Sequence, residues 1–90
     1  MKKVSILATN GTIATTVLGP MDVFFLAGRL WNAIYDTPMT PFFEVEILGE
    51  KEGPVKCLNN VLIHPHRTIA DVKKTDLIII SSITSRDRIP

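Results

Sequence analysis

The sequence holds little that would connect it to a disulfide framework, a membrane or a nucleic acid. Of its 90 residues one is a cysteine, Cys57, so no disulfide can form within the chain, which fits a reducing cytoplasm. The formal net charge is +1, and the lysines and arginines form no basic stripe, so we expect no direct nucleic-acid contact. No apolar run approaches the roughly 20 residues of a membrane span. We therefore expect a cytoplasmic protein without a membrane partner.

Motifs for nucleotides, metals and nucleophilic catalysis are also missing. The spacing around Gly11 and Gly19 fits neither the dinucleotide-binding fingerprint nor the P-loop. His64 and His66 are separated by a proline, and no third ligand stands nearby. Cys57 has no adjacent base, which favours a buried small side chain over a nucleophile. The sequence predicts no cofactor, no metal ion and no catalytic residue.

The apolar pattern of the first half predicts strand, loop, helix and strand. Residues 4–8 form a nearly continuous apolar run, typical of a strand buried on both faces of a parallel sheet. Residues 9–18 are expected to form a loop, and Gly19-Pro20 to open a helix. Apolar and acidic residues alternate over 43–47, which predicts a half-exposed strand that closes at Gly49, with its glutamates in solvent. Recurrence at three- and four-residue steps predicts one helical stripe that packs on the sheet, made of Val23, Phe24, Ala27, Leu30, Trp31 and Ile34.

The second half predicts a hairpin, a short helix and another strand. Two apolar segments flank Asn59-Asn60, and asparagine tolerates positive φ, so a β-hairpin is expected. Thr68 and Asp71 have the spacing of a capping box. Residues 77–80 are wholly apolar, which predicts a central strand buried on both faces. Because nothing after this strand can cover it, the sequence predicts an incomplete α/β domain.

The order of these segments resembles that of the ThiJ/PfpI family. The resemblance implies a partial flavodoxin-like parallel sheet with a small β-hairpin. It would be the amino-terminal half of a class I glutamine amidotransferase-like domain over residues 1–83, with an irregular tail at 84–90. The Gly19-Pro20 opening is most similar to the sensor domains of AraC-type transcriptional regulators of the GlxA kind. The segments that carry the resemblance are residues 4–7, 19–24, 43–49, 68–71 and 76–80.

Departures from the enzymatic pattern of the family imply a chain without catalysis. Thr16 stands where active members carry a glutamate or aspartate, and Ser81-Ser82 replaces a turn that is Pro-Gly-Gly in many members. The family's nucleophilic cysteine lies beyond residue 90. The resemblance therefore favours an effector-sensing or dimerisation half-domain of an AraC-type regulator. The alternatives are a fragment of a ThiJ/PfpI enzyme (amidase, hydratase or glyoxalase-like) and a piece without independent function, left by truncation or a shifted reading frame.

One candidate ligand site follows from the expected sheet. Ligands of open α/β sheets bind at the carboxyl ends of the strands. Here that edge carries small hydroxyl and amide side chains, which suit hydrogen bonds to a small polar effector. We also expect self-association into a homo-oligomer through residues 77–80, because exposed apolar strands pair at their edges. The residues of the predicted ligand site are Thr9, Asn10, Thr12, Thr15, Thr16, Gly19, Ser81 and Ser82.

Overall fold

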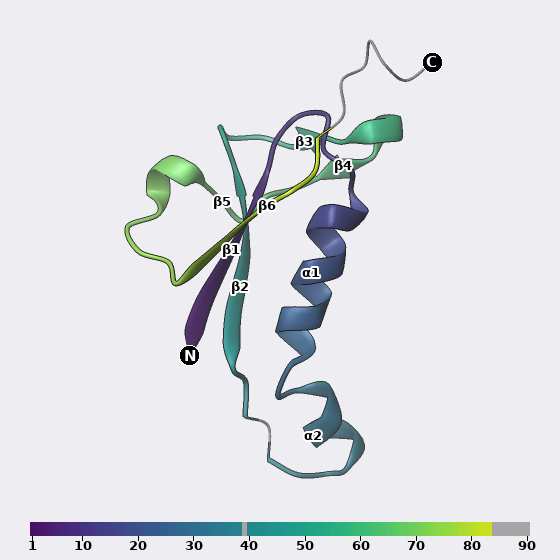
Figure 1. Cartoon of the computed structure of the whole chain (residues 1–90), viewed down its shortest axis with the longest axis vertical. Helices are drawn as coiled ribbons and strands as arrows, with labels where there is room; N and C mark the ends of the chain where they lie inside the picture. Colours follow the sequence, from purple (N-terminus) through teal and green to yellow (C-terminus); the bar gives the residue numbers. More distant parts are fainter. Residues whose placement is uncertain (39, 84–90) are drawn as a thin grey trace.

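The computed structural model describes residues 1–38 and 40–83, so the predicted tail at 84–90 lies outside the described residues. A parallel sheet, a helical connection and a small antiparallel pair make up the molecule (Figure 1). In chain order its elements are β1 (Lys2–Ala8), α1 (Thr15–Leu26), α2 (Leu30–Ile34), β2 (Phe43–Gly49), β3 (Val55–Lys56), the 3₁₀ turn η1 (Leu58–Asn60), β4 (Leu62–Ile63), β5 (Arg67–Thr68), the 3₁₀ turn η2 (Ile69–Asp71) and β6 (Leu77–Ile80).

The main sheet has the strand order β5-β2-β1-β6, and its neighbouring strands are all parallel. β1 lies inside it, where Val4 pairs with Val45 on one side and with Leu77 on the other. Val4 and Ser5, which lie on opposite faces of the strand, are 1% and 0% exposed, as a strand covered on both faces requires. The predicted α/β class and the predicted parallel strand at the start of the chain are confirmed.

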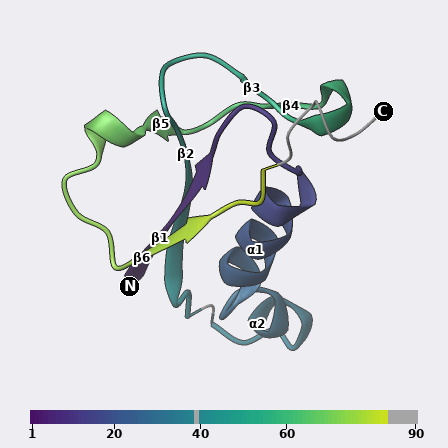
Figure 2. The same cartoon turned by 45° about the horizontal axis from the view of Figure 1, so that its top comes forward.

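The two faces of the sheet are covered by different connections. Figure 1 shows α1 on one side of the sheet and η2 on the other, and the turned view in Figure 2 agrees. The core lies between α1 and the sheet, where Val17 is fully buried. Phe24 packs edge-to-face on Phe43 with ring centroids 5.0 Å apart. Full burial of a side chain such as that of Val17 contributes about 1.5–3 kcal/mol to folding.

The helix begins earlier than Gly19-Pro20, which corrects the sequence-based prediction. α1 starts at Thr15, so Thr15, Thr16 and Gly19 are helical residues, and Pro20 lies inside the helix. Proline is most favourable in the first helical turn because its missing N–H has no partner there. Here the burial of Val17 against the sheet outweighs that preference, since this residue belongs to the turn before the proline.

The predicted helical stripe is confirmed only at Phe24, which packs on the core. Val23, Leu30, Trp31 and Ile34 are exposed. Val23 lies on the outer side of α1, whereas α1 ends at Leu26 and Gly28, with a φ of 77°, redirects the chain, so α2 does not continue the face of α1. The residues that α1 turns toward the sheet are Val17, Met21 and Phe24, which keep helical spacing from an earlier start.

The two local turn predictions are confirmed. β3 and β4 pair antiparallel through Val55 and Ile63, and Asn59 and Asn60 both adopt a φ of 61° between them. Thr68 and the carboxylate of Asp71 form the expected capping box at η2. These features depend on residues close in sequence, so local rules suffice for them.

The strand at 77–80 is parallel to β1, but it is not central. β6 forms the edge of the sheet, and Leu77, Ile78 and Ile80 are exposed. The prediction of burial on both faces is therefore wrong for the described chain. The strand is exposed because no described strand pairs with the outer side of β6. An apolar composition alone therefore does not bury a strand.

The prediction that the glutamates of the second strand are solvated is wrong for Glu46, which is buried. It is 8% exposed, on the sheet face opposite α1. Alternation along the strand places it correctly away from the core. The residues that cover it come from β1 and β5, and a pattern within the strand does not reveal them.

Candidate functional site

The carboxyl ends of β1 and β6 meet in a cluster of hydroxyl groups. The Thr12 hydroxyl donates to Ser81 Oγ at 2.6 Å and lies 2.9 Å from the Ser82 carbonyl oxygen. Ser81 Oγ donates in turn to the carbonyl oxygen of Leu7 at 2.9 Å. An isolated bridge between Thr12 and Ile83 continues the contact. These predicted site residues come together as expected, but they bind one another.

Thr16 connects α1 to the same cluster. Its hydroxyl donates to the carbonyl oxygen of Ile13 at 2.6 Å and accepts from the Ser82 N–H at 3.1 Å. Thr15 and Gly19 are exposed along α1. Thr16 therefore supplies a hydroxyl that holds the helix against the end of β6.

The remaining two predicted residues face the loop that follows β2. Asn10 Oδ1 accepts from the Lys56 N–H at 3.1 Å, which fixes the loop against β3. Thr9 Oγ1 is buried and has no hydrogen-bond partner among the described residues. Thr9 and Asn10 line a hollow of about 40 Å³ with residues 50–55. That volume holds a few water molecules, whereas ligand pockets span about 300–1,000 Å³.

The chemistry of this edge is hydrogen bonding. Thr12, Thr16, Ser81 and Ser82 are hydroxyl side chains, which do not titrate near neutral pH. General acid–base catalysis uses a group whose pKa lies near the operating pH. The cluster thus connects three parts of the chain by hydrogen bonds: the loop after β1, the start of α1 and the end of β6. Its role as a ligand site stays a prediction.

A second polar cluster was missed by sequence reasoning. Arg67 donates to both carboxylate oxygens of Glu46, at 2.9 Å from Nε to Oε2 and 2.9 Å from Nη2 to Oε1. The Ser5 hydroxyl also donates to Oε1 at 3.0 Å, and Lys3 Nζ lies 3.6 Å from that oxygen. The register opposes Ser5 to Glu46, so a buried serine beside a strand glutamate is the signal that could have suggested the cluster.

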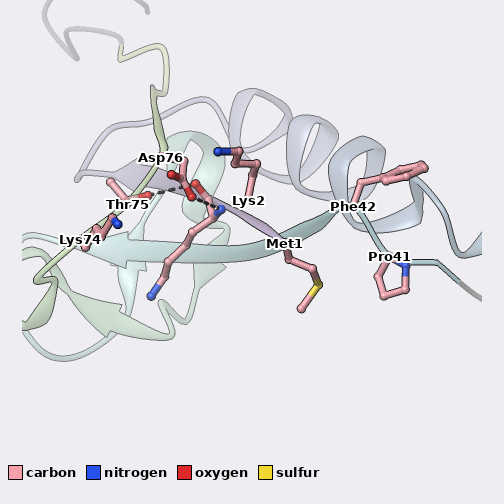
Figure 3. A pocket seen from close by; sticks show the side chains of 8 residues that line it. Met1, Lys2, Pro41, Phe42, Lys74, Thr75 and Asp76 are labelled. Carbon is pink, nitrogen blue, oxygen red and sulfur yellow. Dashed lines mark hydrogen bonds between the residues drawn. The ribbon is translucent and has the colours of Figure 1, made fainter.

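A larger hollow, also missed, lies at the amino ends of the strands. It measures about 700 Å³, and Lys2, Lys74, Asp76 and Phe42 are among its lining residues (Figure 3). The Asp76 carboxylate accepts the Lys3 N–H at 2.7 Å. This hydrogen bond, together with the positive charges of Lys2 and Lys74, lowers the pKa of Asp76. The hollow gathers three segments of the chain that lie more than 30 positions apart in sequence, so no local motif marks it.

The single thiol and one histidine, His66, take structural roles. Cys57 is 3% exposed, and its burial raises the pKa of the thiol, which disfavours the nucleophilic thiolate. His66 Nδ1 accepts the Ile47 N–H at 2.9 Å, and the His66 N–H donates to the Ile47 carbonyl oxygen at 2.8 Å. In residues 1–38 and 40–83, no three His, Cys, Asp or Glu side chains are grouped to hold a metal ion. Within the same residues, no helix has the length and apolar character to cross a membrane.

Comparison with known proteins assigns no family to this chain. No protein-family model matches the sequence, and no curated protein matches it significantly. The functional argument therefore proceeds from the residues and contacts described above.

Proposed function

We propose that the chain is the non-catalytic amino-terminal portion of a ThiJ/PfpI-like domain of an AraC-type regulator, and that it serves dimerisation. The observation that carries this proposal is β6, an edge strand made only of leucine and isoleucine. Ile78 and Ile80 are 54% and 72% exposed on the same sheet face. Such a strand presents unpaired backbone groups and apolar side chains to another chain.

The sheet topology supports the family part of the proposal. β2 and β6 flank β1, while α1 and the segment at 69–76 cover opposite faces. Reading β6 as the third strand of the main sheet gives the 2-1-3 order with which flavodoxin-like sheets begin. In a complete sheet of that kind the third strand has a further neighbour, so β6 is where a flavodoxin-like half would leave an open edge.

The composition of β6 favours a second copy as its neighbour. Natural edge strands discourage pairing with charges, prolines or bulges, and β6 carries no charged residue or proline. Antiparallel pairing about a two-fold axis centred on Ile78 would place Ile78 opposite its own copy and Leu77 opposite Ile79 of the second copy, since opposed residues share a sheet face. Every facing pair is then apolar, and no like charges meet across the axis.

Dimerisation is favoured over effector sensing at the carboxyl edge. Thr12 and Ser81 use their hydroxyls on each other, and the neighbouring hollow holds only a few water molecules. An effector would have to break these bonds before it could form its own. β6 needs no such rearrangement to pair, because its outer edge is open among the described residues.

Sedimentation velocity tests the dimer with one matched pair of variants. Ile80→Lys places a charge on the proposed interface, and Val23→Lys places one on α1 at nearly equal exposure, 72% against 70%. We expect a wild-type dimer, a monomer for Ile80→Lys, and a dimer for Val23→Lys, because only the first places a charge on the apolar edge strand that pairs. A monomeric wild type, or equal effects of the two variants, would contradict the proposal.

The coding sequence after residue 90 tests the regulator against the enzyme alternative. A pair of helix-turn-helix motifs with basic recognition helices supports the regulator. A strand-to-helix elbow with a nucleophilic cysteine and no such pair supports the enzyme.

A further inference from the structure

The hollow at the amino ends of the strands has the size of a small-molecule site. Its volume of about 700 Å³ falls within the 300–1,000 Å³ that ligand pockets commonly have. Three separate parts of the chain line it: the start of β1, the segment before β2 and the segment before β6. It lies at the opposite end of the sheet from the hydroxyl cluster.

Positive charge exceeds negative charge around this hollow. Lys2, Lys3 and Lys74 line it together with one carboxylate, that of Asp76. The ammonium group of Lys3 is directed to Glu46, 3.6 Å away, on one face of the sheet. Lys2 extends to the other side of β1, near Asp76, as Figure 3 shows. Two ammonium groups therefore share a single carboxylate, which leaves a site that attracts an anion.

The carboxylate within the hollow is already bound by the backbone. Asp76 accepts the N–H of Lys3 at 2.7 Å, and Thr75 Oγ1 donates to the Lys3 carbonyl oxygen at 3.2 Å. Because these bonds fix Asp76 to β1, its carboxylate is not free to close over both lysines. The charge of Lys74 in particular can serve an incoming group.

An apolar wall stands on another side of the hollow. Phe42 is 58% exposed, and Pro41 is exposed next to it. Figure 3 shows both rings at the opposite side from Lys74. An exposed aromatic ring and a proline on one side, with a cationic edge on the other, suit a ligand with one apolar end and one anionic end.

We propose that this hollow binds a small aromatic anion, a phosphate or carboxylate group carried on an aromatic ring. The anionic group lies between Lys2 and Lys74, and the ring packs on Phe42. The site does not depend on the dimerisation proposal, because none of these side chains belongs to β6.

Titrations followed by ¹⁵N–¹H correlation spectra test the location, with phenyl phosphate and benzoate as probes. Inorganic phosphate and phenol serve as the half-probes that carry only the charge or only the ring. We expect the amide signals of Lys3, Phe42 and Asp76 to shift, and both whole probes to bind more tightly than either half-probe. Tighter binding of phenyl phosphate assigns a phosphate ligand, and tighter binding of benzoate a carboxylate. Shifts centred on Thr12 and Ser82 would overturn the proposal.

Two adjacent lysines give a matched control for the charge. Lys74→Gln removes a charge from the hollow, whereas Lys73→Gln removes an equal charge from the neighbouring exposed position outside it. We expect Lys74→Gln to raise the Kd for phenyl phosphate about two- to fivefold, the range of one exposed ion pair, and Lys73→Gln to leave it nearly unchanged. Equal changes would show attraction to net charge alone and would refute the site.

Discussion

The carboxylate of Glu46 is held by three side chains on a face of the sheet that the core does not use. Arg67 supplies two hydrogen bonds, Ser5 a third, and Lys3 a nearby positive charge. A carboxylate that is 8% exposed needs such partners, because leaving it unpaired in a low-dielectric setting costs several kcal/mol. Bidentate geometry from a guanidinium is the strongest form of this contact.

A double-mutant cycle on this pair is the first prediction at the residue scale. Arg67→Met leaves Glu46 without its main partner, and we expect a loss of about 2 kcal/mol in the free energy of unfolding, less than for a fully buried pair because Arg67 is 37% exposed. The double variant Glu46→Met/Arg67→Met should lose less than the single one, since no charge is left unpaired. Urea denaturation measures both. A double variant at least as unstable as Arg67→Met would show that the pair itself contributes the stability.

Glu46 also shows where sequence reasoning ends. The alternation of the second strand correctly predicts the face of Glu46, but its hydrogen-bond partners Arg67 and Ser5 lie 21 and 41 residues away. Ser5, which contacts both Glu46 and Thr75, pairs across the sheet in a register that the sequence does not specify. Burial of a polar strand residue depends on such long-range partners.

At the scale of elements, two glycines of the helical connection predict opposite responses to one substitution. Gly28 has a φ of 77°, and a Cβ there would lie 1.9 Å from the carbonyl oxygen of Thr40. Gly19 lies inside α1, with nothing within 4 Å of its Cβ position. We expect Gly28→Ala to cost at least 1–3 kcal/mol, roughly the strain of a left-handed residue alone. Gly19→Ala should stabilise by about 0.5–1 kcal/mol through helix propensity.

Thermal unfolding followed by circular dichroism compares these variants directly. Gly19→Ala also bears on the ligand prediction, because this residue was expected at the carboxyl edge and lies instead on the exposed side of α1. A destabilised Gly19→Ala variant would indicate a contact there that the structure does not contain.

The elements themselves divide into those that local rules predict and those that they do not. The hairpin around Asn59 and the capping box at Thr68 depend on neighbours in sequence and are confirmed. The start of α1 depends on where Val17 meets the sheet, and its end on where Gly28 meets Thr40. Both are tertiary contacts, which override propensity and capping preferences.

At the scale of the whole molecule, dimerisation through β6 would make stability depend on concentration. A partner that binds only the folded chain stabilises it by mass action. We expect the urea midpoint of the wild type to rise over a roughly hundredfold range of protein concentration, because each tenfold step adds about 1.4 kcal/mol per mole of dimer to the apparent free energy of unfolding. Ile80→Lys should unfold at one midpoint throughout. A wild-type midpoint independent of concentration would count against the dimer.

The same scale shows what the sequence could and could not predict of the candidate sites. It predicted that the loop after β1 and the end of β6 would meet, because parallel strands align their carboxyl ends. It did not predict that Thr12 and Ser81 would use their hydroxyls on each other. It also missed the hollow near Lys74, because its walls meet only once the strands of the sheet are in register.

The pairing of β1 has a consequence for the order in which the chain folds. Val4 meets Val45 and Leu77, which follow it by 41 and 73 residues. During synthesis the first strand therefore leaves the ribosome long before either of its neighbours exists. Contacts between such distant positions are the slow kind, since closing a long loop costs entropy before any pairing rewards it. The nascent segment would spend that interval as an unpaired apolar strand, the state in which chaperones recognise a chain.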